Sequence, residues 1–187
     1  MKVTFDLSDK DLKYFRRAMR KVREKHAGTS EADIVLACRT LIDGIAETSS
    51  PDFVRIRVQK LGILIDMLED GEWALSKADR DRVLRGMAYF AEEDDMIPDK
   101  VPVLGFLDDA IMVELVVEEL VHEIEAYADF CAFRERRSAA AGQNEDAVSR
   151  EAWIASRRQA LHARMRRRRS RRRSRGRVGG GRTTSLW

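Results

Sequence analysis

Four aspartates lie close together around two prolines in the middle of the chain, and carboxylates at this density could bind a divalent cation. They are Asp95, Asp99, Asp108 and Asp109. Mg²⁺ and Ca²⁺ prefer carboxylate oxygens, so these side chains are weak candidate metal ligands. The alternative is that they cap helix ends and brace the proline turn through hydrogen bonds to the backbone. Their spacing matches no known cation-binding loop, which favours the structural role.

A run of arginines is the second group of residues with evident chemistry. From Arg164 to Arg182 the chain holds eleven arginines and no acidic residue. The candidate anion-binding residues are Arg164, Arg166, Arg167, Arg168, Arg169, Arg171, Arg172, Arg173, Arg175 and Arg177. Guanidinium groups match the geometry of phosphate oxygens, and a segment this rich in one charge should not fold on itself in water. We therefore predict that residues 164–187 form a disordered tail that binds nucleic acid without sequence preference and in a salt-dependent manner.

Three other interpretations of the arginine run stay open. Two of them follow from the uneven distribution of charge along the chain. Residues 1–133 carry 18 Lys and Arg against 28 Asp and Glu, whereas residues 134–187 carry 17 Arg against 4 acidic residues. The tail could contact the protein's own acidic body, or it could bind the surface of an anionic membrane. Because Arg-, Ser- and Gly-rich ends also arise as low-complexity sequence, a tail with little function is the third alternative.

No arrangement of residues in the sequence is typical of an enzyme. Glu119-x-x-His122 has the spacing of a di-iron ligand pair, but neither His26 nor His162 has the Glu three positions earlier that a second pair requires. We expect these histidines to lie on helix surfaces, paired with acids. Phosphate-binding glycine loops, nucleophile motifs and Cys/His zinc clusters are also missing from the sequence. The prediction is a non-enzymatic protein with no cofactor and no small-molecule substrate.

Helix-start signals divide the first half of the chain into four helices. Ser8, Ser30 and Ser76 are each followed three residues later by an aspartate, as in a capping box. Ser50 precedes Pro51, which suits the first position of a helix. With apolar residues recurring at helical spacing, these signals predict helices at about 8–27, 30–47, 51–70 and 76–91.

The second half of the chain should contain two longer helices. After a loop at about 92–106, a long helix is expected from about Asp108 to Arg137. On it, Ile111, Leu115, Leu120, Ile124, Tyr127, Phe130 and Cys131 should face the core, and Glu114, Glu118, Glu119, Glu123 and Glu125 should largely face solvent. A hinge at 138–144 and a polar helix at about 146–168 follow. The predicted fold is all-α, a small bundle of about five helices with a sixth polar helix and a disordered C-terminal tail.

The proline turn also resembles a known family. A known signature runs approximately Ser-Pro-x-Asp-Leu-Ile-Pro-Asp-x-Ile-Pro-x-Leu-Gly-x-Leu-Asp-Asp. The residues that match it in register are Asp95, Ile97, Pro98, Asp99, Pro102, Leu104, Gly105, Leu107, Asp108 and Asp109. This signature is similar to that of the YkvA-like domain of unknown function. The resemblance implies a small helical domain at about 84–125, without an established activity, and many relatives look membrane-associated. Glu92-Glu93 replaces the Ser-Pro pair of the family, a charged departure that argues against membrane association here.

These observations predict three parts of the chain. They are an acidic helical body at 1–137, a hinge and polar helix at 138–163, and the arginine tail at 164–187. The signature turn, Asp95, Pro98, Asp99, Pro102, Gly105, Asp108 and Asp109, should serve structure or an interaction. The first residues hold no apolar stretch of a secretion signal, and two cysteines are too few for a disulfide framework. We expect a cytoplasmic binding module, with peripheral contact at the inner face of the membrane as the alternative.

Overall fold

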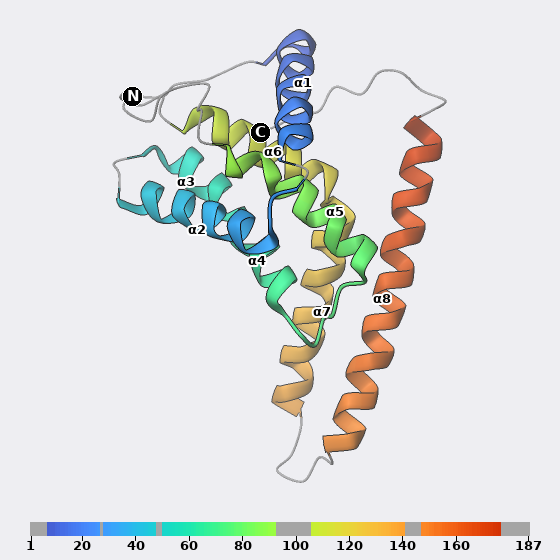
Figure 1. Ribbon diagram of the computed structural model, residues 1–187. Helices are drawn as coiled ribbons and strands as arrows, with labels where there is room; N and C mark the ends of the chain where they lie inside the picture. Colours follow the sequence, from blue (N-terminus) through green and yellow to red (C-terminus); the bar gives the residue numbers. More distant parts are fainter. Residues whose placement is uncertain (1–6, 27, 48–49, 93–105, 141–146, 177–187) are drawn as a thin grey trace.

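The computed structural model describes residues 7–26, 28–47, 50–92, 106–140 and 147–176, and every regular element in these ranges is a helix (Figure 1). The elements are α1 (Asp9–Lys25), α2 (Glu31–Glu47), α3 (Asp52–Val58), α4 (Lys60–Glu69), α5 (Lys77–Met87), the 3₁₀ helix η1 (Ala88–Ala91), α6 (Leu107–Glu119), α7 (Val121–Ala140) and α8 (Ala147–Gly176). The all-α prediction is confirmed. Among the described helices, none combines the length and the apolar character needed to cross a membrane.

Serine caps start three of these helices, as their spacing predicts. The Ser8 hydroxyl accepts a hydrogen bond from the backbone N–H of Asp11 at 3.3 Å, and the Asp11 carboxylate accepts one from the Ser8 N–H at 2.9 Å. The hydroxyls of Ser30 and Ser76 likewise accept from the backbone N–H of Asp33 and of Asp79, at the starts of α2 and α5. The start at Ser50-Pro51 is wrong by one residue, because Pro51 occupies the cap position and α3 begins at Asp52.

The long helix expected between Asp108 and Arg137 is divided at Leu120. The backbone there leaves the helical range (φ −100°, ψ 13°), which separates α6 from α7. Leu120 is fully buried, and a Cβ atom placed on Gly86 of α5 would lie 3.0 Å from its Cδ1 atom. Because Gly86 has no side chain, Leu120 approaches it closely, and α5 packs directly beside the break between α6 and α7.

The last two helices lie side by side as an antiparallel pair, with α7 descending and α8 returning along it (Figure 1). Trp73, in the connection between α4 and α5, anchors this pair to the rest of the molecule. Its ring is fully buried and lies 5.1 Å from the ring of Phe130 and 4.2 Å from the ring of His162, centre to centre. An aromatic cluster of this size supplies a large apolar contact for α7 and α8.

Helix α8 corrects the prediction that the chain is disordered from Arg164 onward. The helix continues through the arginine run as far as Gly176. Disorder was expected because like charges repel, but here carboxylates of other helices lie beside the arginines and offset that repulsion. Residues 177–187 lie outside the described residues.

Candidate anion-binding surface

One side of α8 is apolar and packs on the body of the protein. Ile154, Leu161 and Met165 are buried, and their spacing of seven and four residues places them on one stripe of the helix. Continuing this stripe by four and seven residues leads from Met165 to Arg169 and Arg172. The same side of the helix therefore changes from apolar to cationic along its length.

The arginines on this side meet carboxylates of the body. Arg169 donates to Asp79 at 2.8 Å and to Glu123 at 3.0 Å, and Arg166 lies 3.4 Å from the second oxygen of Asp79. Arg172 pairs with Glu118 at 3.1 Å. We call Arg166, Arg169 and Arg172 the inner arginines. They join α8 to α5, α6 and α7 through charge-assisted hydrogen bonds.

Glu123 corrects the expectation that it faces solvent. Its side chain is fully buried, and the same oxygen accepts from Arg169 and, at 2.9 Å, from Arg82 of α5. A buried carboxylate is tolerated only with partners of this kind, because desolvation of the bare charge is very unfavourable. Glu123 is therefore held between two guanidinium groups.

Asp79 is the second buried carboxylate beneath α8. It takes part in the cap of α5, where the Ser76 hydroxyl donates to it at 2.7 Å. Burial acts to raise the pKa of this carboxyl, but the hydrogen bonds from Ser76 and Arg169 and the charge of Arg166 outweigh burial and hold the pKa below its usual range. The carboxylate is therefore ionised at neutral pH and pairs with α8.

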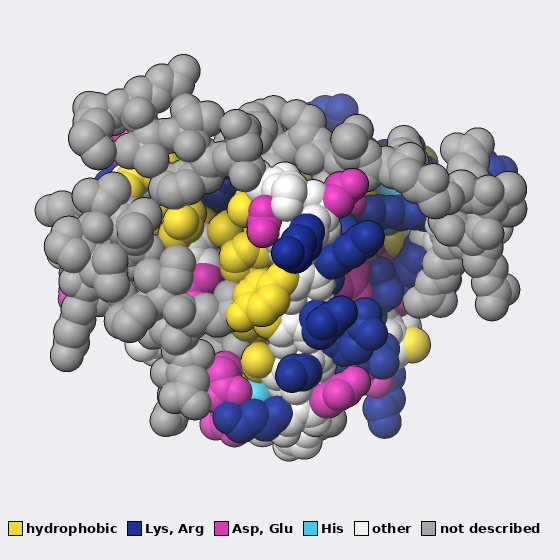
Figure 2. Space-filling model, turned by 90° about the horizontal axis from the view of Figure 1, so that it is seen from above, with side chains coloured by type: hydrophobic (Ala, Val, Ile, Leu, Met, Phe, Trp, Pro, Cys, Tyr) yellow, Lys and Arg dark blue, Asp and Glu magenta, His cyan; other side chains and the backbone are white. Residues whose placement is uncertain are grey.

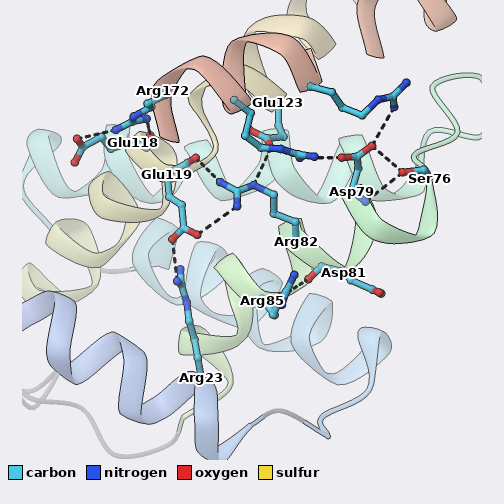
Figure 3. A network of polar contacts seen from close by, with 12 residues as sticks. Arg23, Ser76, Asp79, Asp81, Arg82, Arg85, Glu118, Glu119, Glu123 and Arg172 are labelled. Atoms are coloured by element: carbon cyan, nitrogen blue, oxygen red, sulfur yellow. Dashed lines mark hydrogen bonds and ion pairs between the residues drawn. The ribbon is translucent and has the colours of Figure 1, made fainter. Parts of the chain in front are cut away.

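The ion pairs continue from α8 to the first helix of the chain (Figure 3). Arg82, which binds Glu123, also lies 3.9 Å from Glu119, and Glu119 accepts from Arg23 of α1 at 2.8 Å. Cations and carboxylates thus alternate from α1 through α6, α5 and α7 to α8. Such a network orders the facing side chains of elements far apart in the sequence.

The break at Leu120 gives two of these arginines further partners. The last carbonyls of a helix lack partners within the helix and carry the negative end of its dipole. At the end of α6, the Glu118 carbonyl accepts from Arg172 at 2.5 Å and the Glu119 carbonyl accepts from Arg82 at 3.0 Å. Two arginines from other helices therefore cap α6.

Four further arginines on the same stretch of α8 lie beside α7 or face solvent. They are Arg164, Arg167, Arg168 and Arg171, each three or four residues from two of the others, and we call them the outer arginine row. Arg164 pairs with Asp129, and Arg168 pairs with Glu125 at 2.6 Å, but both pairs are half exposed. Arg167 and Arg171 are exposed and have no ion-pair partner within the described part of the chain. In the space-filling view, Lys and Arg side chains gather beside apolar ones on one face (Figure 2).

Part of the predicted anion-binding set is not described at side-chain level. Arg173 and Arg175 belong to α8, but their side chains lie outside the described residues, as does all of Arg177.

The tryptophans near the arginine run offer few aromatic rings for stacking. Trp153 is half exposed and lies under the guanidinium of Arg137, 5.3 Å from the centre of its ring, and Trp187 lies outside the described residues.

Most of the signature turn lies outside the described residues, namely Asp95, Pro98, Asp99, Pro102 and Gly105. Asp108 and Asp109 are buried in the first turn of α6, where negative charge suits the helix dipole. In the described part of the chain, no three His, Cys, Asp or Glu residues form a group that could hold a metal ion. The metal hypothesis on the four aspartates stays a prediction.

The histidines follow the expected pattern in two cases of three. His26 lies 3.5 Å from Glu92, and His122 lies 3.6 Å from Glu125. His162 is not a surface residue, because α8 carries it into the aromatic contact with Trp73. Burial lowers the pKa of its imidazole, with Asp79 acting in the opposite direction and Arg166 in the same one.

The buried carboxylates were missed from the sequence, although one signal was present. Leu120, Glu123, Tyr127 and Phe130 follow one helical stripe in which Glu123 is the only polar member. An acid on an otherwise apolar stripe indicates a buried charge that needs a cationic partner. The spacing of residues in the sequence does not show which arginine is the partner of Glu123, because Arg82 and Arg169 are distant from it in the chain.

Comparison with known proteins gives one match. Residues 83–115 match a family described as a protein of unknown function, DUF1232, which confirms the resemblance to a YkvA-like domain of unknown function. The matched residues run from Val83 in α5 to Leu115 in α6 and do not include α8. No curated protein and no solved structure matches the chain.

Proposed function

We propose that the protein is a binding module for nucleic acid that uses the outer arginine row of α8 to contact phosphates without reading sequence. The observation that carries this proposal is the pair Arg167 and Arg171, which are exposed on an ordered helix and have no acidic partner among the described residues. Guanidinium groups in this state are free to form bidentate hydrogen bonds with phosphate oxygens.

The geometry of the row suits an extended polyanion. At 1.5 Å per residue, Arg164 and Arg171 lie about 10 Å apart along the helix axis. One strand of a duplex carries a phosphate about every 3.4 Å along its axis, so the row spans roughly three phosphates. The half-exposed pairs of Arg164 and Arg168 contribute little to stability and can exchange a carboxylate for a phosphate.

The apolar side of α8 favours nucleic acid over a lipid surface. A helix that lies in a membrane interface needs an exposed apolar face opposite its basic one. Ile154, Leu161 and Met165, which form the apolar stripe of α8, are buried against the body instead. Attraction to anionic lipid would then rest on charge alone.

The test is fluorescence anisotropy of labelled single-stranded and double-stranded oligonucleotides with the whole chain, over a range of salt concentrations. The Arg167→Ala/Arg171→Ala variant is compared with an Arg39→Ala/Arg55→Ala control, which removes the same charge from α2 and α3 on the other side of the molecule (Figure 1). On single strands, the slope of log affinity against log salt should fall by about 1.4 in the α8 variant and stay near the wild-type value in the control.

Two results contradict the proposal. One is an equal loss of affinity in both variants, since that reports net charge and not the row. The other is binding to vesicles of anionic phospholipid by a protein that binds no oligonucleotide at low salt, which assigns the surface to lipid.

A further inference from the structure

A cavity of about 510 Å³ lies where α1, α5, the α6–α7 break and α8 meet. Six arginines line it: Arg16, Arg20 and Arg23 from α1, Arg82 from α5, and Arg169 and Arg172 from α8. Its volume falls in the range of pockets that hold small molecules. Since the outer arginine row does not line the cavity, the two features are separate.

Positive charge exceeds negative charge around the cavity. Beside the six arginines, only two of its lining residues, Glu118 and Glu119, are acidic. Each of these carboxylates is shared by two arginines, since Glu118 pairs with Arg16 at 3.2 Å and with Arg172 at 3.1 Å. Arg20 is exposed and has no ion-pair partner within the described part of the chain. The lining therefore retains cationic groups that an anion can neutralise.

Three of the arginines that line the cavity are held by carboxylates, and one of them keeps a donor without a partner among the described residues. The side chains of Arg23, Arg82 and Arg169 are only 16–21% exposed and pair with Glu119, Glu123 and Asp79. Figure 3 shows Arg23 beside Glu119 and Arg82 beside Glu123. The Nε atom of Arg23 is buried and has no hydrogen-bond partner among the described residues. A buried donor without a partner in a cationic cavity is explained by an anion or water that accepts from it.

The rest of the lining indicates which anion fits. Met19 and Leu115 are the apolar members, and the lining residues include no Phe, Tyr or Trp, so that His122 is their one ring on which a base could stack. Glu118, held between Arg16 and Arg172, occupies the kind of position that a phosphate takes between two guanidinium groups. We propose that the cavity is a binding site for a small anion with two or more phosphate groups, recognised by phosphate and not by a base.

The test is isothermal titration calorimetry of the whole chain with tripolyphosphate, orthophosphate and ATP at matched ionic strength. Tripolyphosphate should bind more tightly than orthophosphate, and ATP should bind no more tightly than tripolyphosphate. Arg20→Ala should weaken tripolyphosphate binding about tenfold or more, because it removes a charge-assisted hydrogen bond. Since Arg20 holds no structural partner among the described residues, its variant should retain wild-type helicity by circular dichroism.

Matched controls separate this site from the nucleic-acid surface. Arg17→Ala removes the same charge from an exposed position of α1 that does not line the cavity, and it should leave tripolyphosphate affinity within about twofold of wild type. Arg167→Ala/Arg171→Ala should lower oligonucleotide binding and leave tripolyphosphate binding intact. The proposal is overturned if tripolyphosphate does not bind, if Arg20→Ala and Arg17→Ala behave alike, or if ATP binds much more tightly than tripolyphosphate.

Discussion

The two sides of α8 carry the same residue type at adjacent positions and meet different surroundings. Among the inner arginines, Arg166 and Arg169 contact the buried carboxylate of Asp79, and the side chain of Arg169 is only 21% exposed. In the outer row, Arg167 and Arg171 are exposed and have no acidic partner in the described structure. By residue type all of these arginines are equivalent. In the folded protein, some attach α8 to the other helices, and others are available to a ligand.

Helix α8 is strongly cationic and is nevertheless helical in the folded protein. Helices in proteins are stabilised mainly by packing of one face and less by intrinsic propensity. Here the apolar stripe packs the first half of α8 against the body of the protein. In the second half, Arg169 donates hydrogen bonds to the buried carboxylates of Asp79 and Glu123. The ion pairs thereby offset the repulsion between the arginines, except at Arg167 and Arg171, which have no acidic partner among the described residues.

Replacing Glu123 by alanine should have the largest effect on the inner side. The change leaves Arg82 and Arg169 without their shared buried carboxylate, a loss of about 3–5 kcal/mol in the free energy of unfolding. Urea denaturation measures it. Glu125→Ala is the matched control, since Glu125 also lies on α7 and pairs with an arginine of α8 but is half exposed, and it should cost less than about 1 kcal/mol. Equal losses would mean that burial does not distinguish the two sides.

Leu161→Ala tests whether apolar packing, in addition to the ion pairs, holds α8 against the body of the protein. Leu161 is 2% exposed, and removing a buried leucine side chain costs about 2–5 kcal/mol. Trypsin cleavage within α8 should also accelerate, because the arginines become accessible when the helix detaches. Leu36→Ala, the same change at a leucine 64% exposed on α2, should alter stability by about 0.5 kcal/mol or less. If Leu161→Ala is equally mild, the ion pairs alone dock the helix.

Acidification should lower the free energy of unfolding in two steps, both due to residues at the inner side of α8. The pKa of His162 is lowered by burial from its ordinary value of 6.5, so the unfolded state takes up this proton first and stability falls as the pH drops below 6.5. The pKa of Asp79 is also lowered, so its contribution is present above the ordinary value of 3.8 and is lost as the pH falls through the folded value. Urea denaturation at several pH values measures both steps. A His162→Gln variant should lack the first, and an unchanged first step would exclude His162 as its source.

The smallest effect on stability is expected on the outer side. Arg167→Ala/Arg171→Ala should change the free energy of unfolding by no more than about 0.5 kcal/mol, because neither side chain has an acidic partner in the described structure. The same urea experiment checks this value. A loss of several kcal/mol would show that these arginines also attach the helix, and the distinction between the two sides would fail.

Helix positions were largely predictable, since they depend on local chemistry. The capping serines and the period of apolar residues act within a few residues of each other, and α1, α2 and α5 begin where their caps predict. The division at Leu120 was not predictable, because α6 and α7 read as one continuous apolar pattern. At the division, Leu120 packs against Gly86 of α5, a contact between distant segments that the spacing of residues does not reveal.

The all-helical fold, the opposite charge of the two parts and the resemblance of the middle segment to a domain of unknown function follow from the amino-acid sequence alone. Which arginines pair with buried carboxylates and which face solvent depends on how the helices pack. The physical reason is that a charge becomes structural when an opposite charge is held beside it away from water. Asp79, Glu123 and Arg169 lie far apart in the chain, so their pairing exists only once α5, α7 and α8 have packed together.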